Sequence, residues 1–434
     1  MKYFNIKLLF VSLLFVYSGI TTNAQVLKET NPEQAGMNAQ RLELLDDFIQ
    51  KYIDDEKVPG GVFLVARKGN IVYNKSFGTR DEKNEKYRQN DIFRIASMTK
   101  AVTTVAIMQL YEQGKLGLDE PVQKYIPSFR EQKVLDSFDK TDSSYTTVPA
   151  NRPVTIRHLL THTSGISYGG FNPGKIQIVY NKFNLDEFGL SHPTSNTEEM
   201  TNQIAKAPLV FQPGEKYMYG LNMDVLGRVI EVVSDVGLDE YFRQNIFEPI
   251  GMDDSYFYLP ENRHSRLVPV YMQTKDGFKL AEQQGEFGGL NYPKTTGLTN
   301  FAGGGGLSST ALDYAILIQT LLNSGKYNGF QLLGRNTIEL ITSDQMIELN
   351  KKGTGFSKSP GVTYGLGFSL LTEEAKGRSS KSPGTYEWGG YFNTKFFIDP
   401  QEELIFVGMT QIVPFNHGDF WNKMYAIIYG AIDD

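Results

Sequence analysis

The sequence predicts a mixed α/β fold, in which an antiparallel β-sheet is flanked by helices and interrupted by a large all-helical insertion. Near the start, residues 61–66 and 70–77 are β-rich runs joined by Arg67-Lys68-Gly69, a pattern typical of an antiparallel hairpin. Strand-like runs return only near the end of the chain, at residues 366–371, 386–399 and 404–411. We therefore expect both ends of the chain to build one sheet.

Helical periodicity fills most of the remaining sequence. Residues 38–53 predict an amphipathic helix before the hairpin, and residues 419–432 predict a closing helix after a turn at residues 399–402 and the last strand. Between the two groups of strands, apolar spacing predicts helices at residues 98–113, 224–233, 238–247 and 311–324. The expected division is a sheet subdomain at about residues 25–95 and 355–434, and a helical subdomain at about residues 96–354.

Long polar stretches separate several of these elements. Long ordered loops often border a binding cleft, although a plain surface loop has the same composition. The stretches are residues 139–153, 191–202, 351–363 and 373–385.

The composition is that of an ordinary globular protein. The chain has 434 residues, of which 40% are hydrophobic and 21% are charged, and its net charge is −6. This charge gives no broad basic surface, so nucleic acid and anionic lipid are not expected partners. The absence of cysteine excludes disulfides, thiolate metal sites and a cysteine nucleophile. We expect a small-molecule substrate and neither a metal nor a cofactor.

Residues 1–24 have the features of a secretory signal peptide. Lys2 and Lys7 precede an apolar stretch at residues 8–17, and Thr22-Asn23-Ala24 supplies small residues for cleavage after Ala24. The apolar stretch is shorter than the roughly 20 residues that a membrane-spanning helix needs. We therefore expect residues 25–434 to be exported, to the periplasm or the medium, without stable membrane insertion.

Ser97 and Lys100 indicate a nucleophile paired with a base. Ser97 lies at the natural start of the helix predicted at residues 98–113. A separation of three residues puts the two side chains on neighbouring turns of one face, where a lysine amine can accept the serine proton. Burial and the positive end of the helix dipole both favour the neutral amine that this role requires. A capping serine and a solvated lysine explain the same spacing, so partners elsewhere must decide.

Two further motifs supply such partners. Tyr219 follows a Pro-Gly turn and precedes the helix at residues 224–233, so it could relay a proton; a half-buried structural tyrosine is the alternative. Trp388-Gly389-Gly390-Tyr391 lies in a strand predicted to continue through Phe396 and Phe397. Paired glycines weaken a strand unless something, such as an acyl group, must approach its backbone closely; a β-bulge is the alternative.

In this order and at these separations, the three motifs resemble the serine β-lactamase and penicillin-binding protein superfamily, especially class C β-lactamases, D-stereospecific peptidases and family VIII carboxylesterases. Residues 158–165, 246–252 and 303–309 are similar to further segments of that superfamily. The resemblance implies a serine β-lactamase/DD-peptidase-like fold and no cofactor. It implies that Ser97 is acylated, that Lys100 is its base and that Tyr219 is a second proton-transfer residue. The backbone amides of Ser97 and Tyr391 would form the oxyanion hole.

The substrate-binding residues implied by the resemblance are Asn222, Trp388, Gly389 and Gly390. Leu221 holds the usual place of the asparagine, which here comes one residue later. Trp388 stands where β-lactamases and transpeptidases commonly carry Lys or His, as it does in the esterase branch. An indole offers an apolar face and one neutral donor in place of a cation, which favours uncharged acyl substrates. Lys395 and Arg157 are the candidates for a charge supplied from elsewhere.

The sequence therefore indicates a serine hydrolase that cleaves ester or amide bonds through an acyl-enzyme, with carboxylesterase-type activity as the first choice. A β-lactamase or a D-amino-acid peptidase or amidase is the alternative. An inactive binding or sensor protein of the same fold is disfavoured by the intact Ser97, Lys100 and Tyr219.

Short motifs that suggest other sites fit less well. Ser167 lies in a Gly-x-Ser-x-Gly pattern typical of α/β-hydrolases, but Gly170, Pro173 and Gly174 prevent the helix that must follow. His158 and His162 lack the glutamate of the helical zinc motif. The glycines at residues 303–306 lack the Gly-Lys-Ser/Thr of a phosphate loop, so we expect their backbone to line the cleft.

Overall fold

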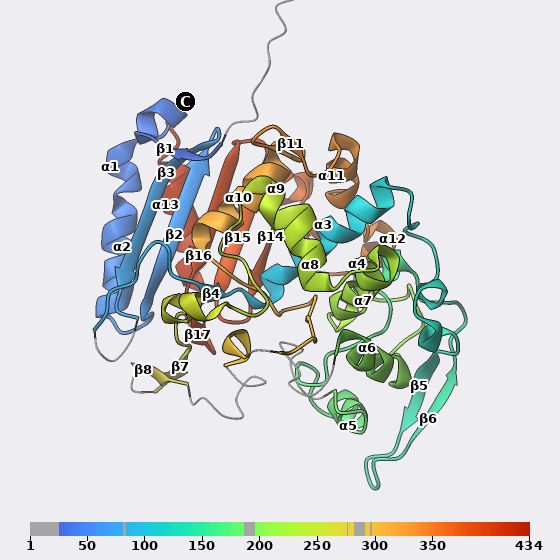
Figure 1. Ribbon diagram of the computed structural model, residues 1–434. Helices are drawn as coiled ribbons and strands as arrows, with labels where there is room; N and C mark the ends of the chain where they lie inside the picture. The colour runs from blue at the N-terminus through green and yellow to red at the C-terminus, as the bar shows by residue number, and fades with distance from the viewer. Residues whose placement is uncertain (1–25, 81–83, 186–195, 276, 282–290, 296) are drawn as a thin grey trace, which may run out of the picture.

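The body of the fold is an eight-stranded sheet (Figure 1). The computed structural model describes residues 26–434 except 81–83, 186–195, 276, 282–290 and 296, so the predicted signal peptide lies outside the described residues. The strand order is β1-β3-β2-β16-β15-β14-β13-β12, and only the pair of β1 and β3 is parallel. The strands are β1 Lys28–Glu29, β2 Gly60–Arg67, β3 Asn70–Gly78, β12 Val362–Tyr364, β13 Ser369–Leu371, β14 Tyr386–Gly390, β15 Thr394–Asp399 and β16 Leu404–Met409. The prediction that both ends of the chain build one sheet is confirmed.

β2 and β16 join the two ends of the chain within this sheet. They pair antiparallel, from Arg67 opposite Leu404 to Val62 opposite Met409. Successive strand residues point to opposite faces, so Val62 faces one hydrophobic core and Phe63 the other. Because both faces are covered, β2 is buried along its whole length.

Helices cover both faces of the sheet (Figure 1). α2 Leu44–Asp54 and α13 Asp419–Gly430 pack on one face, and α10 Ala311–Leu322 packs on the other against β2, β15 and β16. The remaining helices are α1 Ala39–Leu42, α3 Thr99–Glu112, α4 Ile156–Leu160, α5 Lys175–Asn181, α6 Thr197–Lys206, α7 Asn222–Ser234, α8 Leu238–Phe242, α9 Glu248–Ile250, α11 Arg335–Ile341 and α12 Ile347–Lys351. Within the described part of the chain, no helix combines the length and apolarity needed to cross a bilayer.

The expectation of an all-helical middle is wrong. β5 Lys133–Phe138 and β6 Tyr145–Pro149 form an antiparallel hairpin inside it, so part of the loop predicted at residues 139–153 is a strand. The run Thr146-Thr147-Val148 is β-branched and favours extended structure. Of the loop predicted at residues 191–202, residues 191–195 lie outside the described residues. The rest is not a loop, because Asn196 caps α6 and the helix begins at Thr197. The other short strands are β4 Phe93–Arg94, β7 Tyr271–Thr274, β8 Gly277–Leu280, β9 Ser308–Ser309, β10 Lys326–Tyr327, β11 Phe330–Gln331 and β17 Ile412–Val413.

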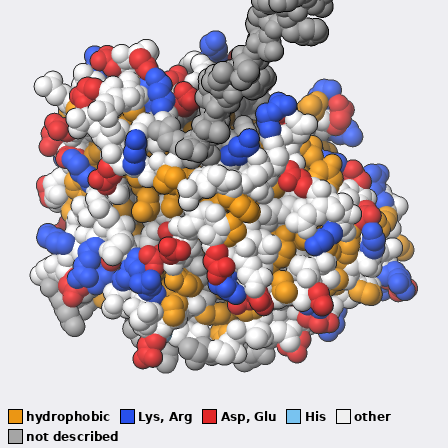
Figure 2. Space-filling view, turned by 45° about the horizontal axis from the view of Figure 1, so that its top comes forward, with side chains coloured by type: hydrophobic (Ala, Val, Ile, Leu, Met, Phe, Trp, Pro, Cys, Tyr) orange, Lys and Arg blue, Asp and Glu red, His pale blue; other side chains and the backbone are white. Residues whose placement is uncertain are grey.

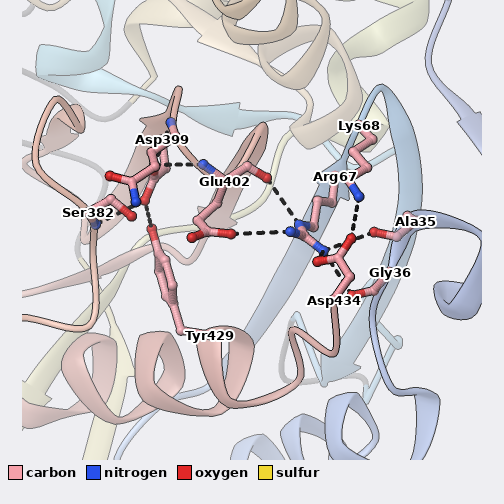
Figure 3. Close-up of polar contacts among 10 residues, drawn as sticks. Ala35, Gly36, Arg67, Lys68, Ser382, Asp399, Glu402, Tyr429 and Asp434 are labelled. Atoms are coloured by element: carbon pink, nitrogen blue, oxygen red, sulfur yellow. Dashed lines mark hydrogen bonds and ion pairs between the residues drawn. The ribbon is translucent and has the colours of Figure 1, made fainter.

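Polar contacts hold the turn between β15 and β16 and the last residue of the chain (Figure 3). The predicted turn at residues 399–402 is confirmed, since Asp399 accepts hydrogen bonds from the backbone of Gln401 and Glu402. The buried guanidinium of Arg67 donates to backbone carbonyls of residues 35, 36 and 402. It also pairs with the carboxylates of Glu402 and Asp434, at 3.1 and 2.7 Å.

Arg67→Met is expected to lower the free energy of unfolding by about 2–4 kcal/mol. Methionine has a similar length, but it leaves the carbonyls without their donor, removes the cation from Glu402 and leaves Asp434 with Lys68 alone. Urea titration followed by intrinsic fluorescence measures the change. The control is Lys68→Met, which removes a half-exposed cation that also contacts Asp434 and is expected to cost less than about 0.5 kcal/mol. Equal losses in the two variants would contradict the role given to the buried guanidinium.

The surface carries both signs of charge. Acidic and basic side chains are interspersed across the face shown in Figure 2. This distribution agrees with the net charge of −6 in giving no reason to expect a polyanionic partner.

Candidate active site

Ser97 lies where the chain passes from a short strand into the buried helix α3. β4 pairs with β9, and Ala96–Met98 then form a 3-10 turn that leads into α3. Ala96 has a left-handed backbone with φ of 42°, which is costly for a residue that has a Cβ. Ala96 is fully buried in a small apolar cluster that holds this conformation. The turn therefore presents Ser97 at a fixed position at the start of α3.

Lys100 is fully buried one turn further along α3. Its amine lies 2.6 Å from the carbonyl oxygen of Gly304, which accepts a hydrogen bond from it. The same amine lies 3.2 Å from Ser97 Oγ and 3.2 Å from the hydroxyl of Tyr168. The ring of Tyr219 faces the amine, with its centroid 4.7 Å away. The structure thus brings Ser97 and Lys100 into contact, as their three-residue separation predicts.

Tyr219 reaches the same serine from a loop before α7. Its hydroxyl donates to Ser97 Oγ at 2.7 Å. The loop is fastened where the Gly214 N–H donates to the carbonyl of Thr163, and Gly214 has φ of 85°, a conformation that favours glycine. Ser97 is therefore hydrogen-bonded to both candidate proton-transfer groups at once.

Asn222 does not line the cleft, contrary to the substrate-binding role expected for it. It is fully buried at the start of α7, and its side chain contacts Ser164 Oγ and the Nδ1 atom of His162. His162 packs against Tyr219, with ring centroids 4.8 Å apart. Burial lowers the pKa of His162 well below its ordinary value, and the charge of Lys100 adds to this effect. Asn222 therefore supports Tyr219 indirectly, through a neutral imidazole.

β14 forms the opposite wall of the site, but the strand predicted at residues 386–399 is two strands. The chain turns at residues 391–393, where Asn393 has a left-handed backbone with φ of 61°. Trp388 consequently pairs with Phe396 across a hairpin, instead of preceding it in one strand. Tyr391 comes directly after the last residue of β14.

The two glycines of β14 are required for different steric reasons, because a side chain at each position would clash with a different part of the chain. A Cβ on Gly390 would lie 2.3 Å from the carbonyl oxygen of Ile95, so glycine lets β14 approach the chain next to Ser97. A Cβ on Gly389 would lie 2.8 Å from Lys395 Nζ on the adjoining β15. The paired glycines predicted that something approaches this strand closely. The groups that do so belong to the same chain, namely Ile95 and Lys395.

A cavity of about 480 Å³ opens at Ser97. Its wall near the serine is aromatic, formed by Phe171, Tyr219, Phe356, Trp388 and Tyr391. The loops at residues 351–363 and 373–385, for which the sequence left a surface loop as the alternative, each contribute a lining residue, Phe356 and Lys381. The other lining residues are Ser369, Lys381, Glu387, Gly389, Gly390, Lys395, Gly418, Trp421, Asn422 and Tyr425.

Three residues next to Lys100 were not anticipated from the sequence. Tyr168 and Gly304 contact its amine, as described above, and Asp224 Oδ1 accepts from the Gly304 N–H at 3.0 Å. Burial raises the pKa of Asp224 to about 6, while the charge of Lys100 opposes this shift. The glycines at residues 303–306 are buried behind Lys100 and are not among the residues lining the cleft, which corrects that expectation. The run of four glycines was the only sequence signal for these contacts. It could not identify the partners, Lys100 and Asp224, because they are far away in the sequence.

The other motifs serve structural purposes. Ser167 is fully buried in a loop, and its hydroxyl donates to the carbonyl of Tyr168. His158 takes part in the N-terminal cap of α4. Arg157 pairs with Asp119 away from the residues that line the cleft. Across the described residues, no group of three or more His, Asp or Glu is placed to hold a metal ion.

Comparison with known proteins agrees with this geometry. The model of the Beta-lactamase family matches residues 45–428. Lovastatin esterase from Penicillium rubens is 32% identical over 388 residues, covering 85% of this chain and 92% of that protein. Esterase EstB from Burkholderia gladioli is 27% identical over 366 residues, covering 82% and 86%. The structure of EstCE1, a hydrolase with promiscuous acyltransferase activity, superposes with a TM-score of 0.77 at 26% identity, covering 90% of this chain and 99% of that one.

Proposed function

The chain belongs to the Beta-lactamase family and is a serine hydrolase with carboxylesterase-type activity, and we propose that Ser97, Lys100 and Tyr219 carry its chemistry. One observation supports this proposal above all. Lys100 Nζ and Tyr219 Oη lie 3.2 and 2.7 Å from the same Ser97 Oγ. A serine hydroxyl is a weak nucleophile until a neighbouring base takes its proton, and here two proton-transfer groups contact it.

The surroundings of Lys100 orient its amine for this task. The carbonyl of Gly304 has no proton to give, so it must accept a hydrogen from the amine. If the hydroxyl of Tyr168 accepts a second hydrogen, both hydrogens of a neutral amine are used. The lone pair then faces Ser97 Oγ, the remaining neighbour. This arrangement lets Lys100 act as the general base.

In the proposed reaction, Ser97 Oγ attacks the ester carbonyl carbon while its proton passes to Lys100. The backbone amides of Ser97 and Tyr391 hold the negative charge that develops on the carbonyl oxygen. The bond to the alcohol then breaks, and Tyr219 delivers a proton to the leaving oxygen and regains one from Lys100. In the second half, water attacks the acyl carbon and loses a proton to Lys100. The bond between this carbon and Ser97 Oγ then breaks, Lys100 returns the proton to Ser97 Oγ, and the carboxylic acid is released.

The walls of the cleft near Ser97 favour esters with apolar acyl groups. Trp388 presents an indole where a cation would be needed to bind a β-lactam carboxylate, and its ring lies 5.6 Å from that of Tyr219. Phe171 and Phe356 extend this apolar wall. The relatives named as esterases support the same choice.

A substrate panel tests the proposal. We expect kcat/KM for para-nitrophenyl butyrate to exceed that for nitrocefin and for D-alanyl para-nitroanilide by about 100-fold or more. The indole offers no cation to the carboxylate of nitrocefin, and the aromatic wall leaves the ammonium of the anilide without an anionic partner. Absorbance of the released chromophores measures all of them. A β-lactam turned over faster than any ester would overturn the preference. Absence of turnover with every substrate would indicate a binding or sensor protein.

We also propose that the enzyme is exported to the periplasm or the medium. The proposal is supported by the N-terminal sequence, where Lys2 and Lys7 precede the apolar stretch at residues 8–17 and small residues surround Ala24. Amino-terminal sequencing of the protein from its native host tests it, with Gln25 as the expected first residue.

A further inference from the structure

The cleft continues around the edge of β14 to the opposite face of the sheet. β13 pairs with β14 only at Tyr386 and Glu387, so among the described strands none covers the edge from Trp388 to Gly390. Trp388 points to the face that carries Ser97. Gly389 and its partner Lys395 point to the other face, because directly paired residues share a face and neighbouring residues alternate. Both faces contribute residues to the one cavity.

Lys395 lies on β15, directly opposite Gly389 of this edge strand, and lines the cavity. Its Nζ lies 2.8 Å from the position of a Cβ on Gly389, so any larger residue there would displace the ammonium. Within the described residues, neither the Lys395 ammonium nor the amide of Asn422 has a hydrogen-bond or ion-pair partner. Burial lowers the pKa of Lys395 and Lys381 adds to the shift, while Glu387 opposes it. A bound anion would stabilise the charged form.

The other charges that line the cavity do not neutralise Lys395. They are Lys381 and Glu387, which form an ion pair with each other. The ammonium of Lys381 also lies over the ring of Tyr425, 5.0 Å from its centroid. The three side chains together carry one net positive charge, and the amide of Asn422 on α13 can donate further hydrogen bonds.

We propose that this outer part of the cleft, formed by Lys395 and Asn422 beside Gly389, binds a carboxylate of the substrate. The preferred substrates are then esters that are apolar at the scissile bond and carry an anionic group further away. This inference rests on the ester-hydrolase function proposed above and narrows its substrate class. Trp388 cannot make a cationic contact to the substrate. The proposal places this contact on the adjoining strand β15, at Lys395.

Matched pairs of esters test the subsite. In one pair the acyl group ends in a carboxylate or in the isosteric primary amide, as in the para-nitrophenyl esters of glutaric acid and glutaramic acid. In the other pair the leaving group carries the difference, as in butyrate esters of para-hydroxybenzoate and para-hydroxybenzamide. We expect the wild type to prefer the acid in one pair, and Lys395→Met to lower the acid-to-amide ratio of kcat/KM in that pair about tenfold.

Lys206→Met is the matched control, because it removes the same charge from an exposed position at the end of α6. Its acid-to-amide ratio should stay within about twofold of the wild type. An unchanged acid-to-amide ratio in both pairs for Lys395→Met would overturn the subsite. Equal decreases of this ratio in Lys395→Met and Lys206→Met would also overturn it, because they would show that only the net charge of the protein matters.

A binding measurement separates failure of the subsite from failure of the esterase function. The two tryptophans of the chain, Trp388 and Trp421, both line the cavity, so intrinsic fluorescence reports its occupation. In a Ser97→Ala background, monomethyl glutarate should bind about tenfold more tightly than methyl glutaramate, and Lys395→Met should remove the difference. Equal binding overturns the subsite even if esters are hydrolysed. Selective binding without hydrolysis by the wild type retains the subsite and overturns the esterase proposal.

Discussion

Ser97→Ala is expected to lower kcat for para-nitrophenyl butyrate by about five orders of magnitude. Among the described residues, the variant removes the only oxygen that contacts both Lys100 Nζ and Tyr219 Oη. Without it no acyl-enzyme forms, and only the slow direct attack of water remains. The fold should persist, because Ser97 is partly exposed at the cleft and alanine suits the start of a helix. Steady-state hydrolysis and mass spectrometry of the acylated protein measure the loss.

Ser167→Ala is the control for this prediction. Ser167 is the other serine in a nucleophile-like pattern, but its buried hydroxyl bonds to the carbonyl of Tyr168 and contacts Asn172. Its ester turnover should stay within about tenfold of the wild type, since the effect is limited to packing near Tyr168. The mechanism is wrong if Ser97→Ala retains turnover and Ser167→Ala loses it.

Lys100→Met is expected to lower kcat by about three orders of magnitude, the usual contribution of a general base. Methionine has nearly the same length and suits a fully buried position. Methionine leaves the buried carbonyl of Gly304 without its donor, so the melting temperature should fall, but by no more than about 5 °C. The combination of lost activity and a retained fold distinguishes a missing base from a damaged core. Steady-state kinetics and thermal melting provide the two readouts.

Lys100→Arg completes this test. A guanidinium stays protonated and has no lone pair to accept the serine proton, so it cannot serve as a base. We therefore expect this variant to be as inactive as Lys100→Met. Activity within tenfold of the wild type in either variant would show that the proton leaves Ser97 by another route, such as through Tyr219.

Local patterns in the sequence predicted much of the sheet and the pairing of Ser97 with Lys100. The hairpin of β2 and β3 depends on neighbouring residues, and a three-residue separation on a helix fixes the distance between two side chains. The same logic failed at residues 386–399, because apolar residues continue through the turn and only Asn393 signals the reversal.

The rest of the site depends on contacts between distant segments, which local patterns do not encode. Gly304 and Tyr168 approach Lys100 from two different loops. Asn222 follows the tyrosine motif closely in sequence, yet the first turn of α7 directs its amide inward to His162. The cationic edge of the cleft likewise becomes visible only when β14 and β15 are seen to pair.

The pairing of β2 with β16 bears on how the protein is made. The middle of the sheet cannot close until β16 has been synthesised, long after β2, and until then β2 exposes an unpaired apolar edge. The segment with Ser97 and Lys100 is synthesised early. β14 is synthesised late, and its Gly390 lies close to the carbonyl of Ile95, just before the turn that holds Ser97. Under the proposed roles, the nascent chain is catalytically silent until its two ends meet.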